Sequence, residues 1–452
     1  MKDSRTKSMT EGRPLPLIIS FALPLMVGNI FQQMYTVVDT MVVGKTLHVG
    51  ALAALGASDW LNWLMLGVIS GLAQGFGILM AQQFGAREYE ALRKTIGCSV
   101  ILSAISAAVL VLIGQLAITP VLRLLQTPAE ILPDSALYLR IMFAGIPVVL
   151  AYNLLACVLR SLGDGKTPLY AMIVASVTNV VLDLLFVPVF GWGIAGAAIA
   201  TVIAQAVSGF YCLLRLKQIP ILNMDSSCFR MDGALSGRLL MLGMPMAAQN
   251  AIIAVGGMII QSVVNGFGVV FIAGYTAANK MYGLLEMAAV SFGYAMVTYA
   301  GQNLGAGKPD RIRLGVKTAS IVAVAVSAAI CALMHLLGKS ILSGFISGTP
   351  EAAAQAMDIA YEYLTVMSLC LPVLYILHVV RSAIQGMGNT VLPMVSGISE
   401  FVMRTGGVLL LPAVLGYSGV FWAEVLAWLG ADLILVPGYF WLIRRLDAKI
   451  HT

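Results

Sequence analysis

Long apolar stretches recur along the whole chain, and short polar segments separate them. Each stretch is about twenty residues or longer, which is the length that a helix needs to cross a bilayer. We predict twelve membrane-spanning helices, at residues 15–43, 51–80, 95–117, 134–159, 168–189, 195–214, 239–265, 269–299, 315–337, 352–380, 391–412 and 418–443. The pattern indicates an all-α integral membrane protein.

The composition supports this fold class. Of the 452 residues, 59% are hydrophobic and only 11% are charged, whereas about a quarter of the residues of a soluble domain are charged. The mean hydropathy of +0.91 likewise excludes a soluble fold. A net charge of +6 would suggest a nucleic-acid partner in a soluble protein. Here it follows from where the basic residues lie, so we expect no nucleic-acid partner.

Basic residues fall mainly on one side of the predicted helices. With the N-terminus in the cytoplasm, most of the 27 Lys and Arg residues lie inside, among them Arg13, Arg93, Lys166, Lys308 and Arg381. This distribution predicts a multi-pass protein of the cell membrane with both termini cytoplasmic. The first apolar stretch is too long for a cleaved signal peptide, so it is kept as a span. The six cysteines show no CxxC spacing and are interpreted as packing residues.

The two halves of the chain repeat one another. The segment QQFGAR at 82–87 corresponds to QNLGAG at 302–307, and GDGKTP at 163–168 corresponds to GNTVLP at 388–393. Pro24 likewise corresponds to Pro245. Six spans in each half give equivalent helices the same membrane orientation, which predicts a parallel repeat and two pseudo-symmetric six-helix lobes. The predicted parts are a cytoplasmic tail at 1–14, an N-lobe at 15–217, a linker at 218–238, a C-lobe at 239–445 and a tail at 446–452.

Two acids interrupt apolar spans of the N-lobe. Asp39 lies in the first span and Asp183 in the fifth. A charge at the centre of a membrane helix costs roughly 2.5–3.5 kcal/mol on insertion scales, so such residues usually face a cavity and serve a function. Two carboxylates in one low-dielectric cavity do not both stay ionised, so they take up a proton or recruit a cation.

Other polar residues share helix faces with these acids, because positions three or four apart lie on one side of a helix. Gln32 and Tyr35 precede Asp39 in this way, and Asn179 precedes Asp183. Amide and hydroxyl oxygens suit Na⁺ as well as a proton site. The alternative interpretation is that polar groups of this kind only hold helices together.

The loop segments, the ten residues LRSLGDGKTP at 159–168 and the two six-helix lobes together resemble the multidrug and toxic compound extrusion (MATE) family of transporters. The resemblance covers essentially the whole chain and is closest to the archaeal and related bacterial branch. It implies that an ion site for H⁺ or Na⁺ is formed by Asp39, Asn179, Asp183 and Thr201. It implies that the same cavity is lined by Gln32, Tyr35, Tyr138, Asn153 and Met172.

The C-lobe departs from this pattern. At the repeat offsets, the residues replacing Asp39, Asn179 and Asp183 are Ile260, Arg404 and Val408. The Glu that another MATE branch carries in the seventh span is not evident, which favours ion coupling through the N-lobe. Glu400 and Arg404 are four residues apart and are expected to pair. Glu286 and Arg404 are the candidates for gating or substrate contact in this lobe.

The leading hypothesis is a secondary active antiporter that exports organic, cationic or amphipathic compounds in exchange for H⁺ or Na⁺ by alternating access of the two lobes. The alternative is a flippase or exporter of a lipid-linked oligosaccharide or another metabolite. Such a flippase needs a strongly basic cavity, whereas the intramembrane charges here are mostly acidic. No HExxH, GxSxG or Walker motif is present, so we expect neither an enzyme nor an organic cofactor. The expected partners are small organic substrates and membrane lipids, and one duplicated chain is expected to act as a monomer.

Overall fold

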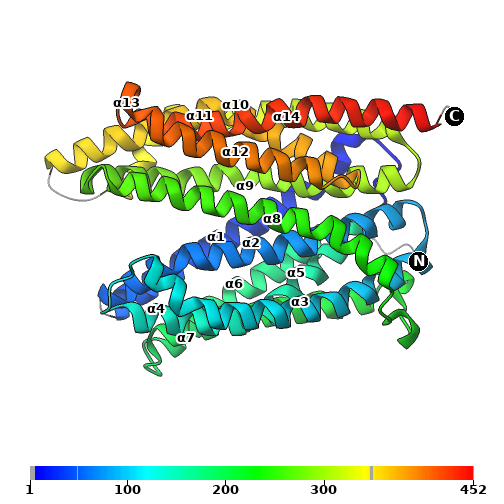
Figure 1. Cartoon of the computed structure of the whole chain (residues 1–452), viewed down its shortest axis with the longest axis horizontal. Helices are drawn as coiled ribbons and strands as arrows, with labels where there is room; N and C mark the ends of the chain where they lie inside the picture. Colours follow the sequence, from blue (N-terminus) through cyan, green and yellow to red (C-terminus); the bar gives the residue numbers. More distant parts are fainter. Residues whose placement is uncertain (1–5, 48, 347–349, 451–452) are drawn as a thin grey trace. The chain divides into compact units, whose positions relative to one another are not determined.

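The computed structural model describes residues 6–47, 49–346 and 350–450. Residues 1–5 and 451–452 of the two predicted tails lie outside this range. The described part is helical and contains no strand (Figure 1). Its α-helices are α1 (Pro14–Thr46), α2 (Val49–Gly85), α3 (Tyr89–Leu124), α4 (Leu132–Ala144), α5 (Ile146–Ser161), α6 (Lys166–Phe186), α7 (Gly193–Lys217), α8 (Gly233–Asn265), α9 (Val269–Gly305), α10 (Pro309–Leu342), α11 (Pro350–Gly386), α12 (Val391–Leu410), α13 (Pro412–Leu415) and α14 (Ser418–Ile450). The predicted linker contains two short 3₁₀ turns, η1 (Pro220–Leu222) and η2 (Ser226–Cys228).

The predicted all-α membrane fold is confirmed. Ten helices of the described chain are long and apolar enough to cross a membrane, and α4 with α5 forms an eleventh, bent span. The bend of 47° lies at Gly145, where Pro147 in the first turn of α5 cannot donate a backbone hydrogen bond. The remaining predicted span, 269–299, coincides with α9, which carries Lys280 and Glu286.

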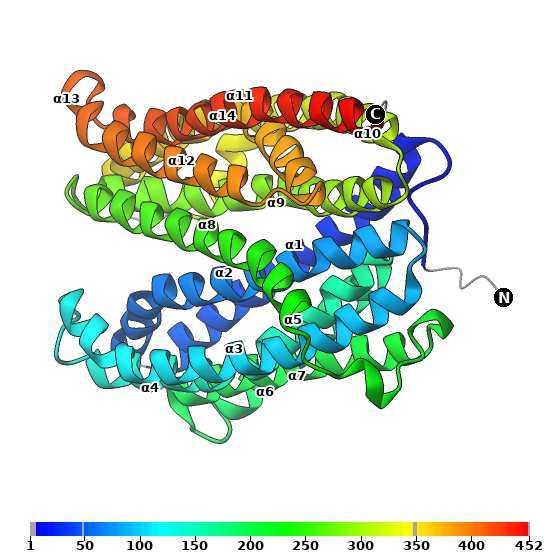
Figure 2. The ribbon, with the colours of Figure 1, turned by 45° about the vertical axis from the view of Figure 1, so that its right-hand side comes forward.

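The chain forms two compact units. Unit 1 contains Leu23–Ala251 with the segment ending at Met9, and unit 2 contains Thr10–Ala22 with the chain from Ile252 onward. In unit 1, α5 packs on α2, α3 and α7, and α6 packs on α7 (Figure 2). In unit 2, α11 packs on α9, α10 and α14, and α12 packs on α14. Equivalent helices of the two halves thus make the same contacts, as the sequence repeat predicts.

The repeated segments form the same turns in both halves. The prediction that QQFGAR and QNLGAG are loops is partly wrong, because α2 continues to Gly85 and α9 to Gly305. Each helix then ends with one residue in the left-handed region, Arg87 at φ 62° and Gly307 at φ 67°. The next backbone N–H donates to the carbonyl five residues back, at 2.9 Å in α2 and 2.8 Å in α9, which is the Schellman way of ending a helix.

The second repeated segment joins a left-handed glycine to a helix cap. Gly163 at φ 79° and Gly388 at φ 86° end α5 and α11. In unit 1, Asp164 Oδ1 then accepts from the backbone N–H of Thr167 at 2.9 Å. In unit 2, Asn389 Oδ1 accepts from the N–H of Leu392 at 3.0 Å. The acid and the amide therefore satisfy otherwise unpaired donors at the start of α6 and α12.

A stripe of glycines on α2 brings this helix against the first half of α8 within unit 1. A Cβ placed on Gly71 would lie 2.6 Å from the backbone N of Ala247, and one on Gly75 would lie 2.3 Å from the Cα of Gly243. One turn earlier, Gly67 faces Asn250, whose amide donates to the Gly67 carbonyl at 2.9 Å. Small residues four apart permit this close approach, which drives helix association in membranes.

We expect Gly75→Ala to lower the apparent melting temperature of the purified protein. The added methyl group meets backbone atoms that cannot rotate away, and overpacking of this kind costs about 1–3 kcal/mol. Gly56→Ala is the matched control, because Gly56 lies on the same helix and a Cβ there meets nothing within 4 Å. Equal melting temperatures for the two variants would show that the glycine stripe does not set this packing.

Candidate functional site

The structure buries both predicted acids of unit 1. Asp39 on α1 is 6% exposed, and Asp183 on α6 is 0% exposed. Asn179 lies one turn before Asp183 and is also 0% exposed. The charges of Asp39 and Asp183 act on one another, so two helices far apart in the sequence bring their carboxyl groups into one electrostatic site. We refer to these two residues as the acid pair.

The oxygens of this site lack partners among the described residues. Asp39 Oδ1, Asn179 Oδ1 and both carboxyl oxygens of Asp183 are buried and accept no hydrogen bond. Buried polar atoms are almost always hydrogen-bonded, so several unpaired acceptors in one place call for an explanation. Carboxyl, amide and hydroxyl oxygens are the groups that bind a proton or a hard cation such as Na⁺. No cluster of three His, Cys, Asp or Glu side chains suited to a metal ion is found in the described chain.

Thr201 on α7 completes the predicted set of four. Its hydroxyl accepts from Asn179 Nδ2 at 3.4 Å and donates to the Ala197 carbonyl at 3.1 Å. This arrangement turns Asn179 so that its amide donor is used and its carbonyl oxygen stays unpaired. The amide oxygen is therefore available to a ligand beside the Asp183 carboxyl.

Two contacts hold α1 against α6 near the acid pair. Ser176 on α6 donates to the Phe31 carbonyl of α1 at 2.8 Å. One turn nearer the start of both helices, a Cβ on Gly28 would lie 2.7 Å from Met172 Sδ and 3.4 Å from the Cα of Leu169. Met172, predicted to line the cavity, thus packs in the space that Gly28 leaves open. The close approach fixes the register in which Asp39 reaches Asp183.

Two tyrosines lie within electrostatic reach of the acid pair. The charges of Asp39 and Asp183 act on the hydroxyl groups of Tyr35 and Tyr138, both predicted cavity residues. The Tyr35 hydroxyl also interacts with the side-chain amides of Gln32 and Gln205. The structure therefore brings together Gln32 and both tyrosines with the predicted ion site.

Asn153 is the exception among the predicted residues. Its amide donates to the Val149 carbonyl of its own helix at 2.8 Å, which is a common way to satisfy a polar side chain within a helix. No contact in the described structure joins it to the acid pair. Its role in the cavity stays a prediction.

Sequence reasoning misses two members of the site. Gln205 lies on α7 one turn after Thr201, and its buried Oε1 also has no hydrogen-bond partner within the described part of the chain. The four-residue spacing from Thr201 is the signal that could have revealed it. Asp59 on α2 is close enough for its charge to act on the Asp39 carboxyl. The sequence alone favours structural pairing for Asp59 over a role in the site, because nothing in a linear sequence places α2 beside α1.

The C-lobe charges form an ion-paired network inside unit 2. Arg404 Nη2 donates to Glu400 Oε1 at 3.0 Å, which confirms the predicted pair, and to Glu424 Oε2 at 2.9 Å. Arg381 Nη2 donates to Glu400 Oε2 at 2.7 Å. Two guanidinium groups and two carboxylates therefore neutralise one another. Gly256 leaves room for this network, because a Cβ there would lie 3.3 Å from Arg404 Nη1.

The network includes an arginine predicted to be cytoplasmic, and two other acids of unit 2 have charged neighbours. Arg381 is buried, and α11 continues beyond it to Gly386. Its predicted place on the cytoplasmic side stays a prediction. Glu286, a gating candidate, has His378 as its neighbour, with 3.8 Å between Oε1 and Nε2. Asp432 lies near the network and interacts electrostatically with Arg381 and Glu400. Its Oδ1 has no hydrogen-bond partner among the residues that the structure describes.

The comparisons with known proteins agree with the fold and with the repeat. The MatE family profile matches residues 24–185 and again 245–407, once in each half of the chain. The chain belongs to the MATE transporter family. Members of this family are transporters and not enzymes, so the chain is a multi-pass membrane transporter.

Relatives and solved structures extend this likeness over the full length. The probable multidrug resistance protein YpnP of Bacillus subtilis (strain 168) is 30% identical over 416 residues, covering 91% of each chain. The crystal structure of a MATE protein in complex with MaL6 shares the fold with a TM-score of 0.90 at 21% identity and covers 100% of both chains. The structure of a transporter of the MOP superfamily from Pyrococcus furiosus matches with a TM-score of 0.89 at 22% identity and covers 99% of both chains. That transporter is described as having a binding pocket of reverse polarity, which suggests a different function for it.

We expect Glu400→Gln to destabilise the protein strongly. The change leaves Arg381 without its carboxylate in a buried site, and breaking a buried ion pair costs about 3–5 kcal/mol. The measurement is the apparent melting temperature in detergent. Asp310→Asn is the control, since it removes a carboxylate that pairs with Arg313 on the exposed surface. A Glu400→Gln protein as stable as this control would mean that the network does not hold unit 2 together.

Proposed function

We propose that this chain is a secondary active multidrug exporter of the cell membrane that exchanges organic, cationic or amphipathic compounds for H⁺ or Na⁺. The observation that carries the proposal is the acid pair, whose buried oxygens have no partner among the described residues. A transporter needs such a group, because a site already satisfied by protein contacts gains little from an ion. The name of the Bacillus subtilis relative, a probable multidrug resistance protein, supports the substrate class.

The acid pair couples ion entry to substrate exit through differential affinity. Without a ligand, two carboxylates repel one another in a low-dielectric site. A proton or Na⁺ relieves this repulsion, and it biases the conformational equilibrium towards the state that binds it more tightly. A substrate that prefers the opposite state, or a cation that competes for the same carboxylates, is then exported as the ion enters.

Two helices run from one unit into the other and supply the connection for alternating access. The boundary between the units falls inside α1, between Ala22 and Leu23, and inside α8, between Ala251 and Ile252. Pro24 lies directly beside the boundary in α1, and Pro245 lies inside α8. Each proline removes one backbone hydrogen bond of its helix and permits bending there. Ion binding at Asp39 on α1 would thereby act on the helix that the units share.

The alternative function is export of an anionic metabolite or a lipid-linked oligosaccharide. The observation that favours it is the pair of buried arginines in unit 2, Arg381 and Arg404, together with the reversed pocket polarity described for the Pyrococcus furiosus transporter. However, Glu400 and Glu424 neutralise both guanidinium groups. The proposed topology with both termini in the cytoplasm and the monomeric transport unit are the same in either case.

We expect Asp39→Asn and Asp183→Asn each to reduce gradient-driven export of a fluorescent cation such as ethidium from proteoliposomes. Loss of the ion site removes the free energy that couples ion entry to substrate export, so the rate of gradient-driven export should fall by about tenfold or more. The pH gradient and the Na⁺ gradient are applied separately, and the gradient that drives wild-type export identifies the ion. Glu130→Gln is the matched control, because Glu130 lies in an exposed turn between α3 and α4.

A variant that lacks both acids distinguishes one ion site shared by Asp39 and Asp183 from two independent ion sites. If both acids serve one ion site, Asp39→Asn combined with Asp183→Asn exports no more slowly than either single variant. Full export by well-folded single variants under both gradients would contradict coupling at the acid pair. Export of anionic but not cationic probes by the wild type would favour the alternative function.

A further inference from the structure

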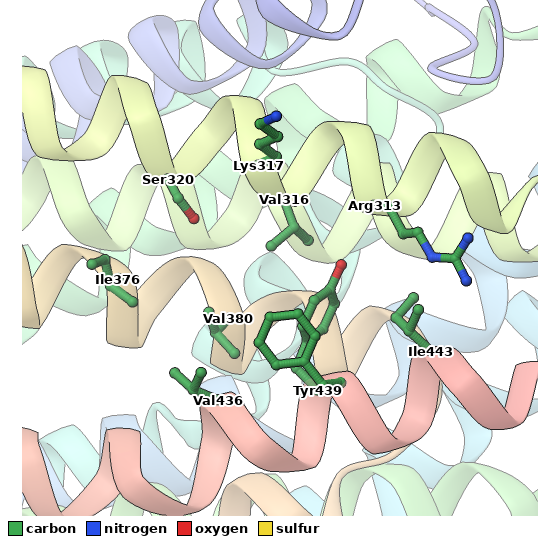
Figure 3. Close-up of a pocket in the computed structure, with 10 residues that line it drawn as sticks. Arg313, Val316, Lys317, Ser320, Ile376, Val380, Val436, Tyr439 and Ile443 are labelled. Atoms are coloured by element: carbon green, nitrogen blue, oxygen red, sulfur yellow. The ribbon is translucent and has the colours of Figure 1, made fainter.

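Unit 2 contains an apolar pocket that transport by the acid pair does not use. It has a volume of about 420 Å³ and lies between α10, α11 and α14 (Figure 3). Val316 and Ser320 point into it from α10, Val380 from α11, and Val436 and Tyr439 from α14. Its size falls within the range of about 300–1,000 Å³ that is usual for small-molecule sites.

The pocket opens on a face that suits hydrocarbon chains. Phe440 lines the pocket and is itself exposed, and Leu433 on the same helix is exposed as well. On the α10 side, Leu314 and Ile321 are also exposed. In a membrane protein, an exposed apolar helix face borders lipid and not water. The natural occupant of this pocket is therefore an acyl chain.

Aromatic and basic side chains place the pocket near one membrane surface. Tyr439 lies in the pocket, and Trp441 follows it on α14 with the Arg445 guanidinium carbon 5.4 Å from the centroid of its ring. Trp and Tyr gather at the level of the lipid head groups, together with basic residues that reach towards water. The predicted positive-inside topology assigns this end of α10 and α14 to the cytoplasmic leaflet.

One basic residue at the pocket is available to a ligand. Arg313 pairs with Asp310 at 3.1 Å and with Asp447. Lys317 is exposed, and no ion pair of this residue is found in the described chain. The stem of Lys317 borders the pocket, while its ammonium group extends away from the apolar centre (Figure 3). A lysine of this kind keeps its charge at the head-group level above an apolar stem.

We propose that this pocket binds an anionic phospholipid of the cytoplasmic leaflet, with one acyl chain between α10, α11 and α14 and the phosphate at Lys317. The apolar lining selects a lipid chain over a soluble anion, and the free ammonium group selects an anionic head group over a zwitterionic one. The site lies wholly in unit 2 and is separate from the acid pair, so the inference does not depend on the transported substrate or the coupling ion.

The direct test is the amount of phosphatidylglycerol that stays bound to the purified protein, measured by native mass spectrometry against phosphatidylcholine. We expect Val436→Trp, which fills the pocket, to lose the bound lipid. Val402→Trp is the matched control, because it adds the same side chain to an exposed position on α12, and the residues that line the pocket come from other helices. We expect Lys317→Gln to lower the preference for phosphatidylglycerol by about fivefold, the effect of one basic residue near an anionic lipid. Lys339→Gln, at the other end of α10, should leave the preference unchanged.

Crosslinking of the wild type provides a second test that does not depend on the folding of a variant. A photoreactive phosphatidylglycerol should label the peptide of α14 that contains Tyr439 and Phe440. Labelling confined to other helices would overturn the proposal. Full lipid retention by Val436→Trp would also overturn it. So would a preference for phosphatidylglycerol over phosphatidylcholine that is the same in Lys317→Gln as in the wild type.

Discussion

The buried carboxyl groups of Asp39 and Asp183 are the constraint on which the proposed function of this protein depends, because three of their oxygens have no hydrogen-bond partner among the described residues. Burying a charge without a partner is so unfavourable that a protein usually neutralises it or surrounds it with donors. Among the described residues of unit 1, no group donates a hydrogen bond to either carboxyl oxygen of Asp183. The surrounding structure holds the site in place by other means, through the close approach at Gly28 and the Ser176 hydrogen bond to α1. The helices around the site are thus packed closely, but several of its oxygens lack partners among the described residues, and we propose that an ion from solution completes it.

The two halves of the chain use one scaffold in opposite ways. Equivalent helices pack on equivalent neighbours, and the same turns end them. At the position that corresponds to Asn179, however, unit 2 carries Arg404, which pairs with Glu400 and Glu424. In unit 2, the guanidinium group of Arg404 therefore neutralises buried carboxylates. In unit 1, a mobile ion is proposed to do the same. This difference explains why unit 1, rather than unit 2, is the stronger candidate for ion coupling.

Much of the fold could be predicted from the sequence, because the bilayer imposes a simple relation between apolar length and helix. All twelve predicted spans coincide with a helix or a bent helix pair. The ends were less predictable, since helices continue beyond the apolar stretch until a residue in the left-handed region ends them. The QQFGAR segment is for this reason partly helical where the sequence suggests a loop. The sequence likewise does not reveal that Arg381 is buried against Glu400, as hydropathy cannot distinguish a helix end from a charge buried by a partner.

From residue spacing alone, the site was predictable only where its residues share a helix, and only the resemblance to the MATE family joined residues of different helices. Spacing along one helix links Tyr35 to Asp39 and Asn179 to Asp183, and it predicts the pairing of Glu400 with Arg404. Contacts between helices depend on packing, which a single sequence does not contain. For this reason the sequence does not assign Asp59 to the site, and it does not foresee the bond of Asn153 to its own helix.

The most direct test of the central claim is the infrared difference spectrum of the carboxyl groups in protein reconstituted into lipid nanodiscs. Spectra are recorded at acidic and alkaline pH without Na⁺, and again after Na⁺ is added. The account predicts carboxyl bands that respond to the proton, to Na⁺ or to both, and that are lost from Asp39→Asn and Asp183→Asn. Bands that respond to neither ion, or that persist unchanged in both variants, would contradict it.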